Sequence, residues 1–550
     1  MPASVTERIR NAGRINQILA VAMRYGFAQV VEQVQAARRG LLKRVRPVEG
    51  APDPKLGAMG TGERLRRMLE ELGPTFVKLG QLLSTRPDLL PIWVIEELVK
   101  LQDRLPPMRF ELVRLTVETE LNAPLEDLFS EFNREPLGSA SLGQVHRAVL
   151  HSGEVVAVKV QRPGIDRTVE RDLSVLNDIV ALLEGRVAVG ARIKLTRAAQ
   201  ELSERLRDEL VYTIEARNAE RVQHTLTPDD GVRIPHVYWH LTSPRVLTCE
   251  LFEAVRFTAP GGPPAELRPD LARRLARFAL RQILVEGFFH ADLHPGNLMA
   301  FANGDLGVID WGQVGLLSRR MRESLDEIFV ALATRDTERL ADEIVRLGLT
   351  EHDADLEGFR YDLSRALDRY YHVPRSDYPL GSILRTIMDL SYEHNVQLPA
   401  ELPMLIKVLV AVEGTCLSLD PQFDLRREFE PVARQVLGRQ LSPEQLLRTV
   451  LASGRQLTRL AQDLPRQVST VMDRMEAGTL ALRVQTDVEE PGRHLGQMLN
   501  RLSLSAIVGG LMVAGALAMP ESRTLGIATF CSGVVAAIAV LFAILRGERL

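Results

Sequence analysis

The segment His290-Ala-Asp-Leu-His-Pro-Gly-Asn297 is followed, after a short connection, by Asp310-Trp-Gly312. The connection contains two short apolar runs that flank the pair Asn303-Gly304. Apolar runs around an Asn-Gly pair are typical of two strands joined by a tight hairpin turn. Such a hairpin would bring Asn297 and Asp310 to the same end of the two strands.

The order of polar residues in this stretch matches the requirements of phosphoryl transfer. In the kinase template, a first Asp receives or orients the proton of the nucleophile, and an Asn and a second Asp hold the magnesium ions on the phosphates. Asp292, Asn297 and Asp310 have that order and spacing. A single Asp beside a turn is often merely solvated, but three polar residues in register with His290 and Gly312 favour the catalytic interpretation.

A loop of small residues between two predicted strands lies upstream. Small side chains allow backbone N–H groups to approach phosphate oxygens. This predicted phosphate loop consists of Gly138, Ser139, Ala140, Ser141, Leu142 and Gly143.

A lysine follows on the next predicted strand, after a turn at Ser152-Gly153. Alternation places Val156, Val158 and Val160 on one face of that strand and Lys159 on the other. An isolated strand lysine is usually a surface residue. The position of Lys159 between the small-residue loop and the later acidic residues favours a nucleotide-binding role.

Two glutamates on a predicted long helix from Thr196 to Gln223 are candidate partners for lysines. Glu209 and Glu215 are six residues apart, so on one helix they would point about 120° away from each other. Each therefore requires a different partner. Either glutamate taken alone is more commonly a solvated helix residue.

The segment Lys78-Leu-Gly-Gln81 lies upstream, on a predicted helix that Pro74 opens. Together with the residues above, it resembles the UbiB family of atypical protein-kinase-like proteins, also called AarF-domain kinases. The resemblance implies an α+β, two-lobed kinase-like fold that has an N-terminal helical extension.

The resemblance also implies roles for individual residues. Lys159 would contact the nucleotide phosphates and pair with Glu215, and Asp292 would be catalytic. Lys78 and Gln81 would belong to a regulatory segment in which Lys78 pairs with Glu209. The implied cofactors are ATP, bound by the phosphate loop, and Mg²⁺, held by Asn297 and Asp310. The implied activity supports ubiquinone or related isoprenoid-quinone biosynthesis.

Three positions depart from the family pattern. Val211 stands where the family usually has Asp, so one carboxylate is missing. Gly138 replaces an alanine in the phosphate loop and gives the backbone more freedom. Trp311 replaces the phenylalanine of the usual Asp-Phe-Gly, and we expect another aromatic ring to be tolerated there.

Composition excludes some classes of protein. The net charge is −3 over 550 residues, which argues against a nucleic-acid binder. Nine basic residues lie between Arg8 and Arg46; they suit either an anionic membrane surface or a solvated helix face. The spacing of Cys249, Cys416 and Cys531 suggests neither disulfides nor a zinc site, and is compatible with a reducing cytoplasm.

Two charge-free runs, Leu502 to Met519 and Leu525 to Leu545, are each near the length of a membrane span. A buried helical hairpin in a soluble core is the alternative. Arg501 and Arg546 flank the outer ends, so both ends are expected in the cytoplasm. We therefore expect a protein of the inner (cytoplasmic) membrane that contacts membrane lipid through a C-terminal transmembrane helical hairpin, with a cytoplasmic catalytic domain.

The expected organisation has six parts. They are an N-terminal helical arm (1–50), the helical extension with the Lys-x-Gly-Gln segment (62–120), a small lobe (121–255), a helical large lobe (256–430), a helical linker (431–501) and two transmembrane helices (502–545).

A helix is predicted from about Ser318, soon after Gly312, which leaves no room for a long peptide-presenting activation segment. The acceptor is therefore expected to be small, lipidic or water. Two hypotheses remain beside a less favoured protein kinase. One is a membrane-anchored ATPase or phosphotransferase that acts with quinone precursors or quinone-biosynthesis enzymes. The other is an ATP-binding pseudokinase that serves as a switch or scaffold.

Overall fold

The computed structural model describes most of the first 428 residues. The predicted helical linker (431–501) and transmembrane hairpin (502–545) lie outside the described residues. The described ranges are 5–41, 59–84, 86, 89–101, 106–184, 195–334, 336–347, 349–350, 354–372, 380–394, 396–399, 401–425 and 427–428.

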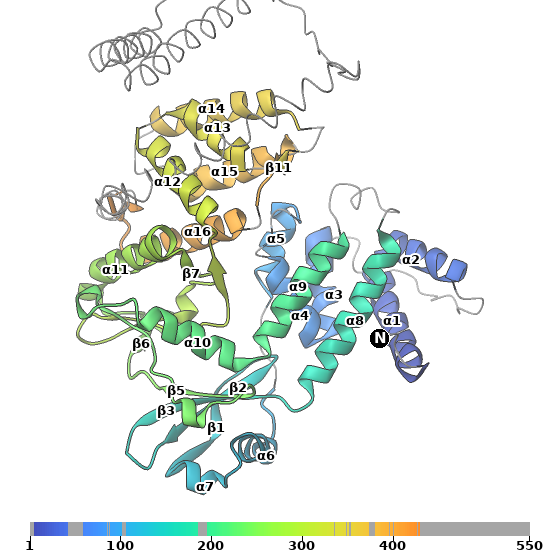
Figure 1. Ribbon diagram of the computed structural model, residues 1–550, viewed down its shortest axis with the longest axis vertical. Coiled ribbons are helices and arrows are strands. Elements are labelled where there is room, and N and C mark those ends of the chain that lie inside the picture. The colour runs from blue at the N-terminus through green and yellow to red at the C-terminus, as the bar shows by residue number, and fades with distance from the viewer. Residues whose placement is uncertain are drawn as a thin grey trace, which may run out of the picture. The chain divides into compact units, whose positions relative to one another are not determined.

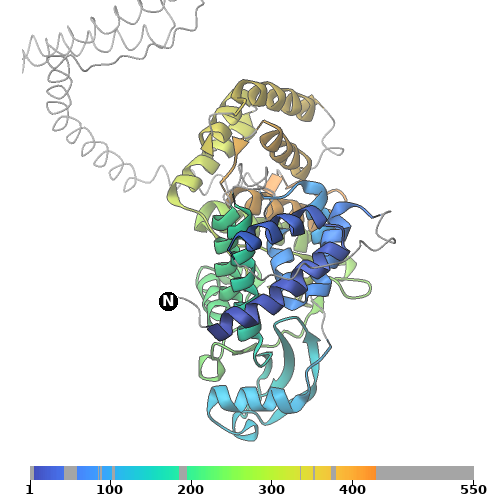
Figure 2. The same cartoon turned by 90° about the vertical axis from the view of Figure 1, so that its right-hand side faces the viewer.

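Helices from two parts of the chain pack together into one layer (Figures 1 and 2). Pro74 is the first residue of α4, as predicted, and Phe76, Leu79 and Leu82 are buried. Their burial against α8 and α9 holds the Lys78 segment in place. The helices are α1 (Val5–Arg24), α2 (Ala28–Leu41), α3 (Thr61–Leu72), α4 (Pro74–Leu83), α5 (Ile92–Leu98), α8 (Ile165–Leu183) and α9 (Leu195–Glu209).

The small lobe is built on an antiparallel four-stranded sheet in the order β1-β2-β3-β5. The predicted alternation on β3 is confirmed, because Val156, Val158 and Val160 are fully buried and pack in a cluster that includes α6 and α7 residues. Lys159 lies on the opposite face of β3. The elements are α6 (Phe110–Leu121), α7 (Leu125–Leu128), β1 (Glu131–Ser139), β2 (Gly143–Val149), β3 (Val155–Gln161) and β5 (Val246–Glu250).

The single helix predicted from Thr196 to Gln223 is wrong. The chain forms α9, which ends at Glu209, and a separate helix α10 (Tyr212–Gln223). Val211 between them has an extended backbone, with φ −109° and ψ 90°. Leu210 is buried in the core beside α8 and α9, whereas Tyr212 is buried in the large-lobe core. The break allows each helix to pack in a different core, so the 120° argument does not apply to the two glutamates.

The large lobe is mainly helical (Figure 1) and contains small sheets that position the polar segments. The predicted hairpin is confirmed: β8 pairs antiparallel with β9, and Gly304 in the turn has a positive φ of 86°. The strands are β4 (Val232–Arg233), β6 (Val255–Arg256), β7 (Phe288–His290), β8 (Leu298–Ala300), β9 (Leu306–Val308), β10 (Val314–Leu316), β11 (Leu349–Thr350) and β12 (Val396–Gln397). The helices are α11 (Arg268–Arg281), α12 (Arg319–Thr334), α13 (Thr337–Leu347), α14 (Leu356–His372), α15 (Leu380–Glu393) and α16 (Glu401–Leu419).

The chain passes from Gly312 through strand β10 directly into α12. The predicted helix is therefore present, and Met321, Leu325 and Ile328 are buried on its inner face. No long activation segment intervenes between residues 312 and 319, all of which are described.

Helix α16 is the one helix in the described part of the chain that is long and apolar enough to cross a membrane. Of its most apolar window, 67% is buried within the protein. Leu405, Val412 and Cys416 pack in the large-lobe core. The apolar character of α16 is thus accounted for by the core of the large lobe.

Candidate active site

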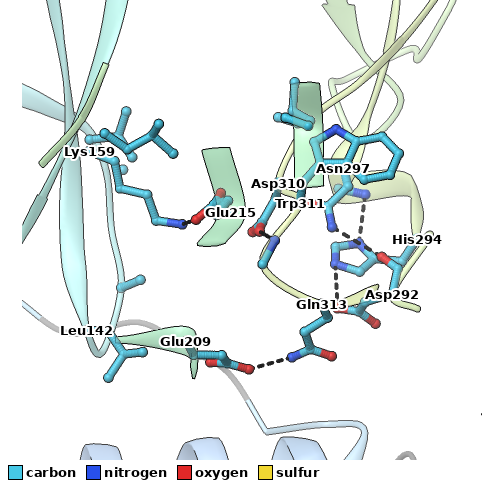
Figure 3. Close-up of a pocket in the computed structure, with 18 of the residues that line it drawn as sticks. Leu142, Lys159, Glu209, Glu215, Asp292, His294, Asn297, Asp310, Trp311 and Gln313 are labelled. Atoms are coloured by element: carbon cyan, nitrogen blue, oxygen red, sulfur yellow. Dashed lines mark hydrogen bonds and ion pairs between the residues drawn. The ribbon is translucent and has the colours of Figure 1, made fainter. Parts of the chain in front are cut away.

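A cavity of about 1170 Å³ lies between the small-lobe sheet, α4, the break between α9 and α10, the catalytic segment (His290–Asn297) and α16. Every residue that the sequence singled out as catalytic, nucleotide-binding, regulatory or metal-binding lines this cavity, except the buried Ser141. Figure 3 shows Lys159 and Glu215 facing Asp310, with Asn297 and Asp292 beyond it.

The phosphate loop is shorter than predicted, because Gly138 and Ser139 still belong to β1 and Gly143 is already the first residue of β2. The turn is closed by the Ala140 N–H, which donates to the Gly143 carbonyl oxygen at 2.8 Å. Arg162 fixes the turn from outside: Nε donates to the Ala140 carbonyl oxygen at 3.1 Å and Nη2 to Ser139 Oγ at 2.9 Å. The loop is therefore held by the residue that directly follows the lysine strand β3.

The two glycines at the ends of the predicted loop have different environments. A Cβ on Gly138 would meet nothing within 4 Å. A Cβ on Gly143 would lie 2.4 Å from the Tyr212 hydroxyl oxygen and 2.5 Å from the Val160 carbonyl oxygen. Gly143 is thus required for packing, whereas an alanine at position 138 fits the space available.

Lys159 and Glu215 form a close ion pair, with Nζ donating to Oε2 at 2.7 Å. Burial alone would lower the pKa of Lys159, but the Glu215 and Asp310 carboxylates outweigh it and hold that pKa well above its usual value. Burial raises the pKa of Glu215, and the Lys159 ammonium opposes that rise. The Tyr212 ring lies 5.0 Å from the lysine nitrogen. The lysine is therefore charged and held in the cavity.

Lys78 and Glu209 form the second pair, with 3.0 Å between Nζ and Oε2. The other oxygen of Glu209 accepts a hydrogen bond from Gln313 Nε2 at 2.8 Å. Gln81, also on α4, donates from Nε2 to the Leu101 carbonyl oxygen at 3.3 Å. Glu209 thus joins the N-terminal extension to the segment that carries Asp310.

The catalytic segment is internally hydrogen-bonded. The Asp292 N–H donates to His290 Nδ1 at 3.1 Å, and Asn297 Nδ2 donates to the Asp292 carbonyl oxygen at 3.2 Å. Burial would raise the pKa of Asp292, but Lys407 and His294 outweigh it and lower that pKa. Asp292 is therefore an ionised carboxylate at neutral pH.

Asp310 has a left-handed backbone, with φ +62°, and its Oδ1 accepts the Gly312 N–H at 3.3 Å. Trp311 is buried against His290 and Phe278, and its Nε1 donates to the Val308 carbonyl oxygen at 3.3 Å. This packing fixes the direction of the preceding aspartate.

The electrostatic environment keeps Asp310 ionised. Burial would raise the pKa of Asp310, but the Lys159 and Lys78 ammonium groups outweigh it and lower that pKa to about 2. Its side chain remains open to the cavity. A charged carboxylate is thus available there for a cation.

The donor set fits magnesium that is shared with phosphates. No cluster of three His, Cys, Asp or Glu side chains suitable for a metal occurs among the described residues. Mg²⁺ usually binds through one or two protein oxygen ligands together with substrate phosphates and water, rather than in an all-protein cage. Asp310 and Asn297 supply such oxygens on one wall of the cavity.

Three residues of this site are absent from the sequence-based predictions. They are Lys407, whose Nζ lies 3.2 Å from Asp292 Oδ1, together with Gln313 and Arg162. Lys407 is the one charged residue in the stretch from Leu402 to Val412 of α16, which is a feature that a sequence search could use. Val211, the departure from the family pattern, lines the cavity as an apolar residue.

Models of protein families match two parts of the chain. The ABC1 atypical kinase-like domain matches residues 100–344, and the UbiB helical domain matches residues 363–424. The first match contains the phosphate loop, Lys159, both glutamates and the catalytic segment. The second contains α16 and Lys407.

Several relatives are similar over most of the chain. Uncharacterized protein sll1770 of Synechocystis sp. is 32% identical over 441 residues, which are 79% of this chain and 75% of that protein. Uncharacterized protein slr0889 of the same organism is 36% identical and covers 64% of this chain and 90% of its own length. The Arabidopsis thaliana protein ACTIVITY OF BC1 COMPLEX KINASE 7, chloroplastic, is 32% identical over 462 residues, 82% of this chain and 66% of that protein.

Among solved structures, the complex of Rv3197 with erythromycin from Mycobacterium tuberculosis matches 64% of this chain and 90% of that chain, at 27% identity and a TM-score of 0.46. The family assignment depends on the domain models and on the relatives at 32–36% identity. The chain therefore belongs to the ABC1 atypical kinase-like family and includes its UbiB helical domain.

Proposed function

We propose that this protein is a magnesium- and ATP-dependent ATPase or phosphotransferase. The observation that carries the proposal is the convergence of Lys159, Asp292, Asn297 and Asp310 on one cavity, with Lys159 already paired to Glu215 at 2.7 Å. These are the parts that phosphoryl transfer requires. Catalysis would then depend on positioning and on charge neutralisation.

Each residue has a distinct task in this proposal. Lys159, held by Glu215, binds the nucleotide phosphates beside the loop from Gly138 to Gly143. Asp292 orients the attacking oxygen, and Asn297 and Asp310 hold the magnesium. When bound, the magnesium neutralises phosphate charge.

The acceptor is proposed to be water or a small or lipidic hydroxyl compound. Two observations support this choice over a protein substrate. The chain has no long activation segment after Gly312, and Lys78 from the N-terminal extension lies inside the cavity, paired with Glu209. The first feature leaves out the segment that would present a peptide, and the second places a charged side chain of the extension in the cavity.

A membrane location is also part of the proposal. Its support is the pair of charge-free runs in the sequence, Leu502 to Met519 and Leu525 to Leu545. We propose that they anchor the enzyme in the inner (cytoplasmic) membrane, in contact with lipid. A link to isoprenoid-quinone biosynthesis is proposed from the resemblance to the UbiB family.

The cellular role is tested by measuring quinones and their precursors in cells that lack this protein. We expect precursor accumulation and less quinone, because the enzyme would support a step on membrane-bound intermediates. Wild-type protein should restore the quinone level and an Asp310→Asn variant should not. Unchanged quinone and precursor levels in cells that lack the protein would contradict the quinone link. They would not bear on the proposed ATP chemistry, which is tested separately.

The Lys78–Glu209 pair is proposed to act as a gate on nucleotide binding. Lys78→Met removes one positive charge near Asp310 and leaves the Glu209 carboxylate, so we expect ATP affinity to fall about tenfold. A Lys78→Met/Glu209→Gln double variant removes both charges and should recover most of that affinity. The dissociation constants are measured by calorimetry, and autophosphorylation is followed in the same proteins. Equal ATP affinity and equal autophosphorylation in the wild type and in both variants would contradict the proposal that this pair is a gate.

A second candidate function is an ATP-binding pseudokinase that serves as a switch or scaffold. It is favoured by Val211, an apolar residue on the cavity wall where the family pattern has a carboxylate. This alternative predicts ATP binding without turnover in lipid vesicles. The ATPase proposal predicts both ATP binding and ATP turnover in the vesicles.

A further inference from the structure

The catalytic segment His290–Asn297 contains no lysine or arginine of its own. A transferring phosphoryl group spreads negative charge over its outer oxygens, and enzymes commonly place a cation from another element against them. In this protein such a cation must therefore come from outside the segment. His294 lies 3.6 Å from Asp292 Oδ2, but a histidine is charged only when it is protonated.

The cations that line the described part of the cavity are Lys78, Lys159, Arg256 and Lys407. Lys159 and Lys78 are each engaged by a glutamate, at 2.7 Å and 3.0 Å. Among the described ion pairs, Lys407 is the one of these four cations that contacts Asp292, with Nζ 3.2 Å from Oδ1. Because Asp292 is the residue proposed to orient the acceptor, Lys407 lies at the end of the cavity where the acceptor would bind.

Helix α16 places Lys407 there. Leu405, Ile406 and Val408 on either side of it are buried in the large-lobe core, whereas the lysine side chain is 29% exposed and faces the cavity. A lysine loses side-chain freedom when it is held in one geometry. An apolar helix that nevertheless directs one ammonium group onto the catalytic carboxylate indicates a role at that carboxylate.

We propose that Lys407 is a catalytic residue whose ammonium group leaves its contact with Asp292 and binds the phosphoryl group during transfer. This inference rests on the proposed function. The bond between the acceptor oxygen and the γ-phosphorus forms as the bond from that phosphorus to the bridging oxygen of ADP breaks. The acceptor proton passes late to Asp292 and then to solvent, and the leaving oxygen stays on ADP. Lys407 donates hydrogen bonds throughout and transfers no proton.

The proposal gives the UbiB helical domain a part in the chemistry, because Lys407 lies within residues 363–424. It also explains the resting contact. While no phosphate is present, Asp292 and Lys407 neutralise each other, and a phosphoryl group offers the lysine a more highly charged partner. Both side chains are about one third exposed, at 29% and 31%, so a small movement of the lysine does not require opening of the core.

The test compares ADP with the non-hydrolysable ATP analogue AMP-PNP, with magnesium, by calorimetry on the full-length protein. Lys407→Met should weaken AMP-PNP binding about tenfold and leave ADP binding unchanged, because only AMP-PNP carries the third phosphate. ATP turnover in lipid should fall about 100-fold. Lys407→Arg, which keeps the positive charge, should recover part of both losses.

The thermal unfolding midpoint checks that Lys407→Met remains folded. Lys100→Met, a matched variant at an exposed lysine outside the cavity, should bind both nucleotides like the wild type. An unchanged ratio of AMP-PNP to ADP affinity together with unchanged turnover in Lys407→Met would overturn the role of Lys407. If the wild type bound neither nucleotide, the proposed function itself would fail, which is a separate and recognisable result.

Discussion

Replacement of Asp310 by Asn is expected to lower magnesium-dependent ATP turnover by at least about 100-fold while the protein stays folded. The carboxylate is the charged magnesium ligand of the proposed site, and an amide cannot supply that charge. Asn has nearly the same shape and keeps an oxygen that can accept the Gly312 N–H. The measurement is phosphate release from ATP in lipid vesicles, with the unfolding midpoint recorded for the same samples.

The pKa of Asp310 defines the pH range over which this expectation applies. Since that pKa is lowered from 3.8 to about 2 in the folded protein, the carboxylate stays charged as the pH falls through the usual range of aspartate. The stability that comes from this charge is present above pH 3.8 and is lost only as the pH falls toward 2. The wild-type carboxylate is therefore charged across the neutral and mildly acidic range, so the loss of turnover in Asp310→Asn should be seen throughout that range.

A matched variant is available on the same hairpin. Asp305 lies in the turn before β9, where it accepts from Asn303 Nδ2 and pairs with Arg274 at 3.4 Å, outside the cavity. Asp305→Asn should keep full turnover and lose at most about 1 kcal/mol of stability. Equal turnover in Asp310→Asn and the wild type would contradict the assignment of Asp310 as a metal ligand.

Replacement of Lys159 by Met is expected to have the second largest effect. It removes the ammonium group that faces the phosphates and leaves Glu215, whose side chain is only 11% exposed, without its 2.7 Å partner. We expect nucleotide affinity to fall at least about tenfold. We also expect a loss of about 1–3 kcal/mol in the free energy of unfolding, because a largely buried carboxylate loses its hydrogen bond.

A double variant separates the two consequences. Lys159→Met/Glu215→Gln removes the unpaired buried charge, so the free energy of unfolding should return toward the wild-type value while nucleotide affinity stays low. Calorimetry with ATP and urea unfolding provide the two measurements. Wild-type nucleotide affinity in the double variant would show that Lys159 does not bind phosphate.

The parts of this site that the sequence predicted are those encoded by local patterns. The alternation of valines on β3 defined the face that carries Lys159, and the Asn303-Gly304 turn brought Asn297 and Asp310 to one end of a hairpin. These features depend on neighbours within a few residues. For that reason the residue spacing alone is sufficient to predict them.

The parts that were missed depend on tertiary packing. Helical periodicity continues through Leu210 and Val211, but the helix breaks there, and Leu210 and Tyr212 on either side of the break are buried in different cores. The contact of Lys407 with Asp292 joins residues 115 positions apart, through a helix whose place is set by the large-lobe core. A local pattern marks Lys407 as a charged residue among apolar ones, but no local pattern encodes its contact with Asp292 or the break between α9 and α10.

The central claim is that the cavity between Lys159 and Asp310 binds ATP together with magnesium. Titration of the wild-type protein with ATP in a calorimeter, with and without Mg²⁺, tests it most directly. We predict one ATP per chain, bound tightly with magnesium and much more weakly when EDTA removes it. An absence of ATP binding at millimolar ATP with magnesium, in protein shown to be folded, would contradict the claim.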